Sequence, residues 1–375
     1  MKLSMSVNDS FLHQTQKFVE IHLAPLVEND SLNLFTGKTL LADAVSSGIL
    51  GVQVPIALGG GGLSFSAKVL ATEMLAAKDF GVAMSLVNTH NVAEQIARIG
   101  NPNLIERYVP DLIAGKKSAC TALTEFGAGS DFSAIQTTAT RSESGWVLNG
   151  TKAWITNAAH AEVVVVYAQT QIGAGSDGIA AFVVDTDKLG FKRLEPHSYP
   201  IASIGAGAFS LTDYQCKDVD MLSPPGDAFK DILQAINGAR IYVASMCCGM
   251  VEACLMIAAS YGSQRHTFGK PLLSHQGWRW QLADASIELD AARSMVLNAA
   301  TLIDDQKDAQ SIAAKAKIFA TRMAQKQISV LMHAMGAEGL TVQYPYMRHL
   351  AAAQIAGMVD GSTEMLLERI TKDFR

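Results

Sequence analysis

The chain has 375 residues, of which 49% are hydrophobic and 17% are charged, and its formal net charge is -5 at pH 7. Such a length exceeds one small core, so we expect two or three domains, and the apolar content excludes a disordered chain. The net acidic charge, without any Lys- or Arg-rich stripe in the sequence, argues against nucleic-acid binding. The low charged fraction suggests that apolar surface is also buried between subunits.

The chain has five cysteines, Cys120, Cys216, Cys247, Cys248 and Cys254. Their odd number, without Cys-x-x-Cys or Cys/His ligand spacing, predicts reduced core thiols in a cytoplasmic protein and no metal site. The first residues lack the apolar segment of a signal peptide, so we expect none. The apolar run 241–259 is interrupted by Glu252 and rich in small residues, which favours a buried helix over a membrane span.

Residues 1–115 are predicted to form an N-terminal helical domain. Apolar residues recur at helical spacing between Phe18 and Leu26, and again over Ala67–Lys78 and Val92–Ile99. The four glycines within Leu58–Leu63 are not followed by the Gly-Lys-Ser/Thr sequence of a phosphate loop. A structural turn is therefore favoured there over a ligand-binding loop.

Residues 116–222 are predicted to form a small antiparallel β domain. Val163–Tyr167 and Ile179–Val184 are rich in β-branched residues and are bounded by turn formers. Trp146–Gly150 ends in Asn-Gly, which is a strong signal for a hairpin turn.

Residues 223–375 are predicted to form a C-terminal helical bundle. Ile287, Ala291, Met295 and Ala299 repeat every four residues and predict the apolar face of one long helix. A second long helix is predicted over residues 313–335, in a bundle that also packs against another subunit. No Gly-x-Gly-x-x-Gly sequence follows a strand, so a Rossmann site is not supported.

The segment Leu123–Asn157 carries the strongest functional signal. It begins with Leu-Thr-Glu-Phe-Gly-Ala-Gly-Ser-Asp and ends with Asn-Gly-Thr-Lys-Ala-Trp-Ile-Thr-Asn, which predicts two glycine-bearing turns around a short strand. Glycine lets a flat ligand approach the backbone, and Trp154 beside Thr156 offers an aromatic face next to a hydrogen-bonding group, as a flavin ring requires. The alternative is a pair of ordinary turns with Trp154 in the core.

Two further segments combine functional groups with a structural alternative. Arg265-His-Thr-Phe-Gly-Lys-Pro271 presents a five-donor guanidinium suited to a pyrophosphate, or merely a solvated arginine between two helices. Val359-Asp-Gly-Ser-Thr-Glu-Met365 presents the carboxylate of Asp360, or merely the N-cap of the helix that follows.

These motifs together resemble the acyl-CoA dehydrogenase superfamily of FAD enzymes, and the resemblance covers nearly the whole chain. It implies a mainly α fold with a central β domain: an N-terminal helical domain, a middle β-barrel-like domain and a C-terminal four-helix bundle. It also implies a homotetramer or homodimer in which Arg265 and Gln276 reach the FAD of a neighbouring subunit. The FAD-binding residues that it implies are Leu123, Thr124, Trp154, Thr156, Arg265, Thr267, Phe268, Gln276, His333, Gly336, Ser362 and Glu364.

The implied reaction is α,β-dehydrogenation of an acyl thioester. Asp360 takes the α-proton while N5 of FAD accepts the β-hydride. Ser130 and Arg240 are implied to lie near the thioester arm, although a turn serine and a surface arginine are equally open. Asp360 departs from the usual Glu by one methylene, a change in position that matters for catalysis. His333 and Glu364 stand where relatives have flavin-contacting glutamines.

The sequence leaves more than one possibility open for the substrate, the electron acceptor and the reaction type. The acyl group is expected on CoA or on a carrier protein, because the Asp360 segment looks like that of biosynthetic members. An electron-transfer flavoprotein or O2 is expected to accept the electrons. A flavin oxidase of the nitroalkane oxidase type, or a monooxygenase, is the rival on the same fold, and Asp360 argues against the monooxygenase. The retained flavin motifs argue against a non-catalytic relative.

Overall fold

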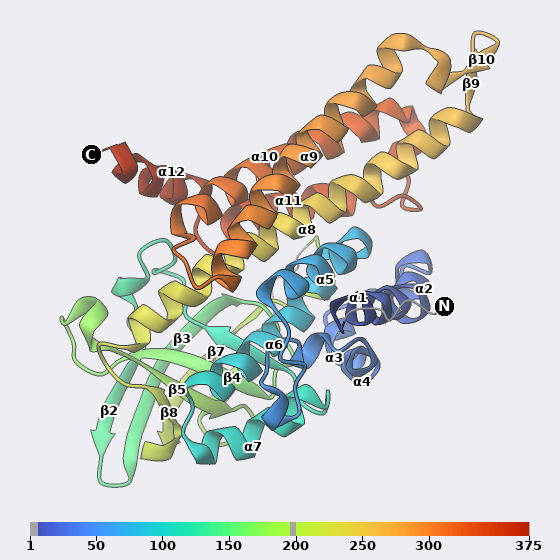
Figure 1. Cartoon of the computed structure of the whole chain (residues 1–375). Coiled ribbons are helices and arrows are strands. Elements are labelled where there is room, and N and C mark those ends of the chain that lie inside the picture. The colour runs from blue at the N-terminus through green and yellow to red at the C-terminus, as the bar shows by residue number, and fades with distance from the viewer. Residues whose placement is uncertain (1–6, 196–199, 375) are drawn as a thin grey trace. The chain divides into compact units, whose positions relative to one another are not determined.

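The computed structural model describes residues 7–195 and 200–374 (Figure 1). The chain divides into two compact units. The first unit comprises Met1–Phe18, Ser31–Ser64 and Met84–Ala235, and the second comprises Val19–Asp30, Phe65–Ala83 and Ile236–Arg375.

Helices of the first unit include α1 (Val7–Phe18), α3 (Thr36–Thr39), α4 (Leu41–Ala44), most of α6 (Phe80–Ile99) and α7 (Pro102–Ile113). Helix α7 begins at Pro102, where the Asn101 side chain accepts a hydrogen bond from the backbone N–H of Leu104 at 3.2 Å and proline fits the first turn. The glycines that follow Leu58 form a turn, as predicted, and a Cβ at Gly60 would lie 2.1 Å from the carbonyl oxygen of Val54.

The first unit also contains an eight-stranded sheet of order β6-β7-β3-β2-β4-β5-β8, with β1 paired to β4. The strands are β1 (Ala119–Ala122), β2 (Thr138–Ser142), β3 (Gly145–Ile155), β4 (Val163–Gln169), β5 (Ile179–Asp185), β6 (Phe191–Arg193), β7 (Gly207–Cys216) and β8 (Met221–Ser223). The predicted strands within β4 and β5 are confirmed, and both are buried throughout because their side chains are apolar on both faces. The sheet is mixed rather than purely antiparallel, since β4 pairs in parallel with β1 and β2.

The hairpin predicted at Asn149-Gly150 is wrong. Both residues lie inside β3, so the second predicted glycine turn is also strand, and the chain reverses at Glu143–Ser144 between β2 and β3. The pairing of β3 with β7 shifts register between Leu148 and Gly150. Gly150 has φ 153°, and a Cβ there would lie 2.7 Å from the Cα of Thr137. The glycine is therefore required by an irregular strand and a close backbone approach rather than by a turn.

The second unit is helical. Its main elements are α5 (Phe65–Lys78), α8 (Ala228–Gln264, from Ile236 onward), α9 (Gln276–Asp304), α10 (Gln310–Ala334), α11 (Tyr346–Met358) and α12 (Thr363–Thr371). The long helices α8, α9 and α10 run beside one another, and the small hairpin of β9 (His266–Thr267) and β10 (Lys270–Pro271) joins α8 to α9 (Figure 1). Asp304, at the end of α9, accepts hydrogen bonds from the backbone N–H groups of Phe65 at 2.7 Å and Ser66 at 3.1 Å, and so caps α5.

Helix α8 is long and apolar enough to cross a membrane by length and composition, but 72% of its most apolar 18-residue window is buried within the protein. It is therefore a core helix, as predicted. It carries Cys247, Cys248 and Cys254, and all five cysteines are buried and free, which confirms the prediction of core thiols. Burial raises the pKa of the Cys247 thiol to about 12, so the thiol stays protonated at neutral pH.

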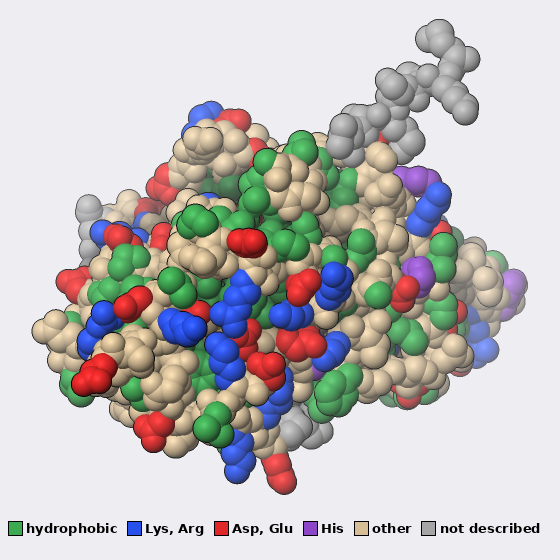
Figure 2. Space-filling model, turned by 90° about the horizontal axis from the view of Figure 1, so that it is seen from below, with side chains coloured by type: hydrophobic (Ala, Val, Ile, Leu, Met, Phe, Trp, Pro, Cys, Tyr) green, Lys and Arg blue, Asp and Glu red, His purple; other side chains and the backbone are tan. Residues whose placement is uncertain are grey.

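Both predicted long helices are confirmed in α9 and α10, but of the four positions predicted for the apolar face of α9 only Ala299 is buried. Ile287 is 67% exposed, and the buried positions are Ala285, Leu289, Ala292 and Val296, followed by Ala299. The buried face combines the small residues Ala285 and Ala292 with Leu289 and Val296, whereas Ile287 faces outward in the single chain. On the face seen in Figure 2, basic side chains are interspersed with acidic ones and with hydrophobic patches.

Candidate functional site

The loop after β1 and the end of β3 lie side by side in the first unit. The backbone N–H of Ala153 donates to the carbonyl of Thr124 at 3.0 Å. Nζ of Lys152 donates to the carbonyl of Leu123 at 2.9 Å and to Oε1 of Glu125 at 2.8 Å. The two halves of the motif that the sequence singled out are therefore joined directly, with Leu123 and Thr124 beside the strand that carries Trp154.

Glu125 and Lys152 form a buried ion pair under this loop. Their side chains are 9% and 0% exposed, respectively. Glu125 also accepts hydrogen bonds from the backbone N–H groups of Gln136 at 2.7 Å and Thr137 at 2.9 Å. Burial alone would raise the pKa of Glu125, but Lys152 and these hydrogen bonds hold it below its usual value. Burial lowers the pKa of Lys152 to about 8. The pair fixes the loop from inside the β domain.

Trp154 lies at the surface rather than in the core. Its side chain is 50% exposed and meets Phe126 edge to face, with ring centroids 5.7 Å apart. Trp154 and Asn157 both have left-handed backbone, with φ 62° and 65°, and Asn157 is buried with its amide donating to the carbonyls of Ser85 and Ala119. The strained end of β3 thus keeps the indole outward while Thr156, next to it, stays partly exposed. Ser130 is exposed in the loop after β1.

The turn that carries Asp360 joins α11 to α12 in the second unit. Asp360 has φ 53° and Gly361 has φ 99°, so two successive residues adopt left-handed backbone. The N-cap of α12 is Ser362, whose Oγ accepts from the backbone N–H of Met365 at 3.4 Å. The capping role that the sequence left open for Asp360 therefore belongs to Ser362. Glu364 is exposed in the first turn of α12.

Asp360 is half-buried, and among the residues that the structure describes its carboxylate has no hydrogen-bond or ion-pair partner within bonding distance. The surrounding helices nevertheless desolvate it, which raises its pKa, while the charges of Lys317 and Arg240 act in the opposite direction. A half-buried carboxylate that is unpaired and less acidic than usual is suited to accept a proton.

Two cations hold the backbone of this turn. Nε of Arg240 donates to the carbonyl of Asp360 at 3.1 Å, and Nη1 of Arg240 donates to Oδ1 of Asn237 at 2.7 Å. Nζ of Lys317 donates to the carbonyl of Gly361 at 2.6 Å and to that of Val359. Arg240 therefore contacts the turn that bears Asp360, and its role toward the thioester stays a prediction.

The other predicted cofactor residues lie at two places in the second unit. Arg265, Thr267, Phe268 and Gln276 lie around the β9–β10 hairpin, where Phe268 is 92% exposed with φ 51°. His333 and Gly336 are exposed at the end of α10 and in the turn that follows it. Nε1 of Trp278 donates to the carbonyl of Ala334 at 2.8 Å, so the start of α9 and the end of α10 lie together.

Sequence reasoning missed Lys152 and Lys317 as individual residues. Each is a buried lysine that donates to backbone carbonyls beside a predicted functional residue. Lys317 stands four residues after Ala313 and four before Thr321 on the buried face of α10. A lone lysine on a stripe of small buried residues is the signal that could have identified it.

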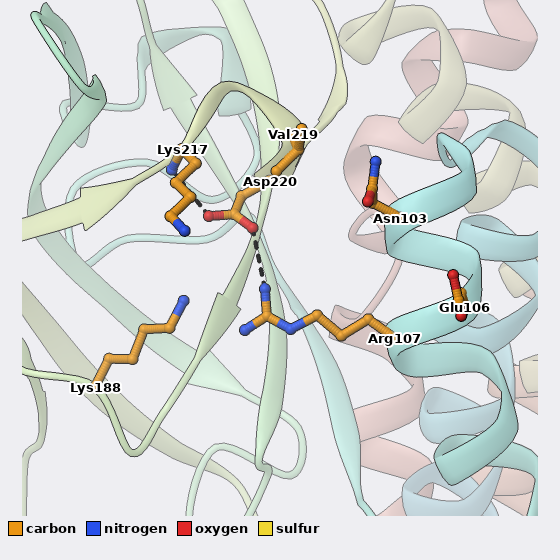
Figure 3. Close-up of a pocket in the computed structure, with 7 residues that line it drawn as sticks. All are labelled: Asn103, Glu106, Arg107, Lys188, Lys217, Val219 and Asp220. Carbon is orange, nitrogen blue, oxygen red and sulfur yellow. Dashed lines mark hydrogen bonds and ion pairs between the residues drawn. The ribbon is translucent and has the colours of Figure 1, made fainter.

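A separate polar pocket of about 580 Å³ lies in the first unit, between α7 and the segments that bear Lys188 and Asp220 (Figure 3). Its lining residues are Asn103, Glu106, Arg107, Lys188, Lys217, Val219 and Asp220. Arg107 pairs with Asp220 at 3.2 Å and also with Asp185, so its guanidinium joins α7 to the sheet. Its lining carries three cations and two carboxylates, Arg107 is already paired, and none of the predicted site residues lines the pocket. We interpret it as a structural junction.

Comparisons with known proteins cover the whole chain. Family models described as the N-terminal, middle and C-terminal domains of acyl-CoA dehydrogenase match residues 8–116, 120–214 and 226–374. The chain is 33% identical over 371 residues to the short-chain specific acyl-CoA dehydrogenase of Megasphaera elsdenii, and the match covers 96% of each. The fold is similar to that of butyryl-CoA dehydrogenase from the same organism, with a TM-score of 0.92, 31% identity and coverage of 100% of both chains. It is also similar to a glutaryl-CoA dehydrogenase from Mycobacterium smegmatis in complex with FADH2, with a TM-score of 0.90, 27% identity and coverage of 99% and 95%.

Proposed function

Because the chain belongs to the acyl-CoA dehydrogenase family, we propose that Asp360 is the base in the reaction that this family catalyses. The protein is an FAD-dependent oxidoreductase that dehydrogenates an acyl thioester between its α and β carbons. The observation that supports Asp360 is its half-buried, unpaired carboxylate on a turn whose backbone two cations hold.

The work required of the base explains why these features matter. An α-proton beside a thioester is weakly acidic, so the carboxylate must be ionised, must point at the proton and must bind it well once it arrives. Desolvation raises the pKa of Asp360 and strengthens it as a base, whereas Lys317 and Arg240 keep the charged form populated. FAD, when bound, supplies the acceptor for the β-hydride.

The residues of the first unit fit the isoalloxazine ring of FAD. Trp154 offers an exposed aromatic face, and Thr124 and Thr156 offer hydroxyls beside it, on a loop that the Glu125–Lys152 pair holds. We assign Leu123 and the three residues just named to the flavin. Ser362, Glu364, His333 and Gly336 are assigned to FAD from the second unit, with an imidazole and a carboxylate where relatives have amides.

A second copy of the chain is proposed to complete the FAD site with Arg265, Thr267, Phe268 and Gln276. Large apolar side chains stand exposed on the second unit, among them Phe268 at 92%, Ile287 at 67% and Trp280 at 58%. Apolar exposure on this scale is typical of subunit interfaces. We therefore expect a homodimer or homotetramer, which light scattering on the purified protein would identify.

For the substrate, we propose a short-chain acyl-CoA, with Ser130 and Arg240 near the thioester arm. The relative's name specifies short acyl chains and CoA, and it favours CoA over a carrier protein. An electron-transfer flavoprotein is proposed as the acceptor, in the cytoplasm. Stoichiometric hydrogen peroxide formation in air would instead favour an oxidase.

The test of the base is anaerobic mixing of the FAD-loaded protein with butyryl-CoA while the flavin absorbance is followed. Asp360→Asn keeps the shape and loses the charge, so it should retain FAD and lose at least about 1,000-fold in the rate of bleaching, as expected when a general base is removed. Bleaching at the wild-type rate by Asp360→Asn would remove Asp360 as the base.

A further inference from the structure

We propose that Lys317 is a positioning residue for the reaction: it fixes the backbone on both sides of Asp360 and supplies the positive charge that faces the carboxylate. The proposal rests on the role of Asp360 as the base. Lys317 belongs to α10 and lies 44 residues before Gly361 in the chain, so only the fold brings the two together.

The turn needs such a residue because of its conformation. Asp360 and Gly361 are left-handed in succession, and only four residues separate the end of α11 at Met358 from the start of α12 at Thr363. Left-handed backbone is disfavoured for residues with a Cβ and persists where neighbouring contacts enforce it. The direction of the Asp360 side chain follows directly from this backbone, so a relaxed turn would turn the carboxylate away.

The contacts that enforce it come from two cations on three consecutive carbonyls. Lys317 donates to the carbonyls of Val359 and Gly361, and Arg240 donates to that of Asp360 between them. Lys317 is 1% exposed, so water has little access to replace its ammonium. Because Val359 and Gly361 flank the base, a rotation of the Asp360 backbone must break a hydrogen bond to Lys317.

The electrostatic role follows from the charged groups around the carboxylate. Arg240 of α8 and Lys317 of α10 act on the carboxylate directly, whereas Arg369 of α12 acts on Arg240 and Cys247 of α8 acts on Lys317. Burial lowers the pKa of Lys317 to about 8, so the ammonium is mostly charged at neutral pH. Without it, desolvation of Asp360 would be opposed by Arg240 alone, and the pKa of Asp360 would rise further.

Exchange of the α-proton separates the base from the redox step. In 3-thiabutyryl-CoA a sulfur replaces the β-carbon, so no β-hydride exists, and exchange of the α-protons in D2O, followed by NMR, reports proton removal alone. The variants are Lys317→Met, which removes donors and charge, and Lys317→Gln, which removes the charge and keeps an N–H donor. Lys315→Met is the matched control, because Lys315 lies on the same helix with its side chain 44% exposed. FAD content and melting temperature are measured for each.

We expect the exchange rate to rise with pH as Asp360 ionises. Lys317→Met should lower the plateau about 10-fold or more through misplacement of the base, and should move the midpoint upward by about 1 unit or more through loss of the facing charge. Lys317→Gln should show the same upward shift with a smaller fall of the plateau, and it decides the question if Lys317→Met does not fold. Lys315→Met should follow the wild type.

Two failures are distinguishable. If Asp360→Asn exchanges the α-protons as fast as the wild type, the base has been assigned wrongly. If Asp360→Asn is inactive in exchange but the folded Lys317 variants keep the wild-type midpoint and plateau, Asp360 remains the base and the positioning role of Lys317 is refuted.

Discussion

The ion pair between Glu125 and Lys152 allows a quantitative test of how the β domain holds the loop after β1, which carries the predicted FAD-binding residues Leu123 and Thr124. Lys152→Met keeps the length of the side chain and removes its charge and donors. It leaves the carboxylate of Glu125, 9% exposed, without its cation, and the carbonyl of Leu123 without the donor at 2.9 Å. The substitution therefore acts on stability and on the loop together.

The expected size follows from the burial of the pair. Removing one partner of a buried ion pair typically destabilises a protein by about 3–5 kcal/mol, because the other charge stays buried and unpaired. Here Glu125 keeps the hydrogen bonds from Gln136 and Thr137, which favours the lower end. For a unit of roughly 200 residues, each kcal/mol shifts the melting temperature by about 2–4 °C, so a fall of roughly 10 °C is expected.

The assay is thermal unfolding with FAD release followed by flavin fluorescence. Lys38→Met is the matched control, since Lys38 pairs with Glu162 at the same 2.8 Å but with side chains 43% and 34% exposed. Exposed pairs contribute about 0–1 kcal/mol, so this variant should melt within a few degrees of the wild type. The double variant Glu125→Gln, Lys152→Met should recover part of the loss, because no unpaired charge remains. If Lys152→Met melts no lower than Lys38→Met, the buried pair does not hold the loop as argued.

Three further predictions rest on other residues or conditions. The difference in free energy of unfolding between the wild type and Lys152→Met should grow as the pH rises from about 8 to 10.5. Lys152 titrates at about 8 in the folded protein and at 10.5 in the unfolded chain, so the unfolded chain binds more protons over that window. Urea titrations at pH 7 and 10 would detect the growth, and a constant difference would contradict it. Gly150→Ala should destabilise the first unit by more than about 1 kcal/mol, because its Cβ would lie 2.7 Å from the Cα of Thr137 and its φ is 153°, and a melting temperature equal to that of the wild type would reject this account of β3. Arg265→Ala should weaken FAD binding about 10-fold or more, or dissociate the oligomer, as loss of a charged hydrogen bond requires; equilibrium dialysis and light scattering test both, and no change in either would reject its role across the interface.

The sequence was most informative where local pattern decides structure. The apolar runs in β4 and β5 and the long alanine-rich helices α9 and α10 were predicted correctly because burial on both strand faces and helical spacing leave direct traces in composition. The motif around Trp154 indicated FAD correctly. The hairpin predicted at Asn149-Gly150 was wrong because Asn-Gly can form a turn or lie in an irregular strand. The close approach of Thr137 to Gly150, which decides between the two, is a tertiary contact that the local pattern does not contain.

Pairings distant in the chain could not be predicted. Lys152 pairs with Glu125 across 27 residues and Lys317 donates to Gly361 across 44, and the segment around each lysine does not indicate its partner. The apolar face of α9 was misassigned for a related reason. Ala285 and Ala292 lie on the core face although alanine is a weak sign of burial, and Ile287 faces outward although it is strongly apolar. The neighbour against which a face packs decides its burial.

The two buried lysines solve the same physical problem at two loops. Left-handed backbone lies close to each of them, at Trp154 near the end of β3 and at Asp360 in the turn before α12, and each lysine donates to backbone carbonyls there. The long side chain of a lysine lets its ammonium group reach from a neighbouring strand or helix and donate hydrogen bonds to those carbonyls. The desolvation that accompanies it appears in the pKa of both lysines, which falls to about 8. Burying a lysine ammonium is unfavourable, yet both lysines are buried where a loop must keep one conformation. This is expected if function at the site, more than stability, determines which residue occupies these two positions.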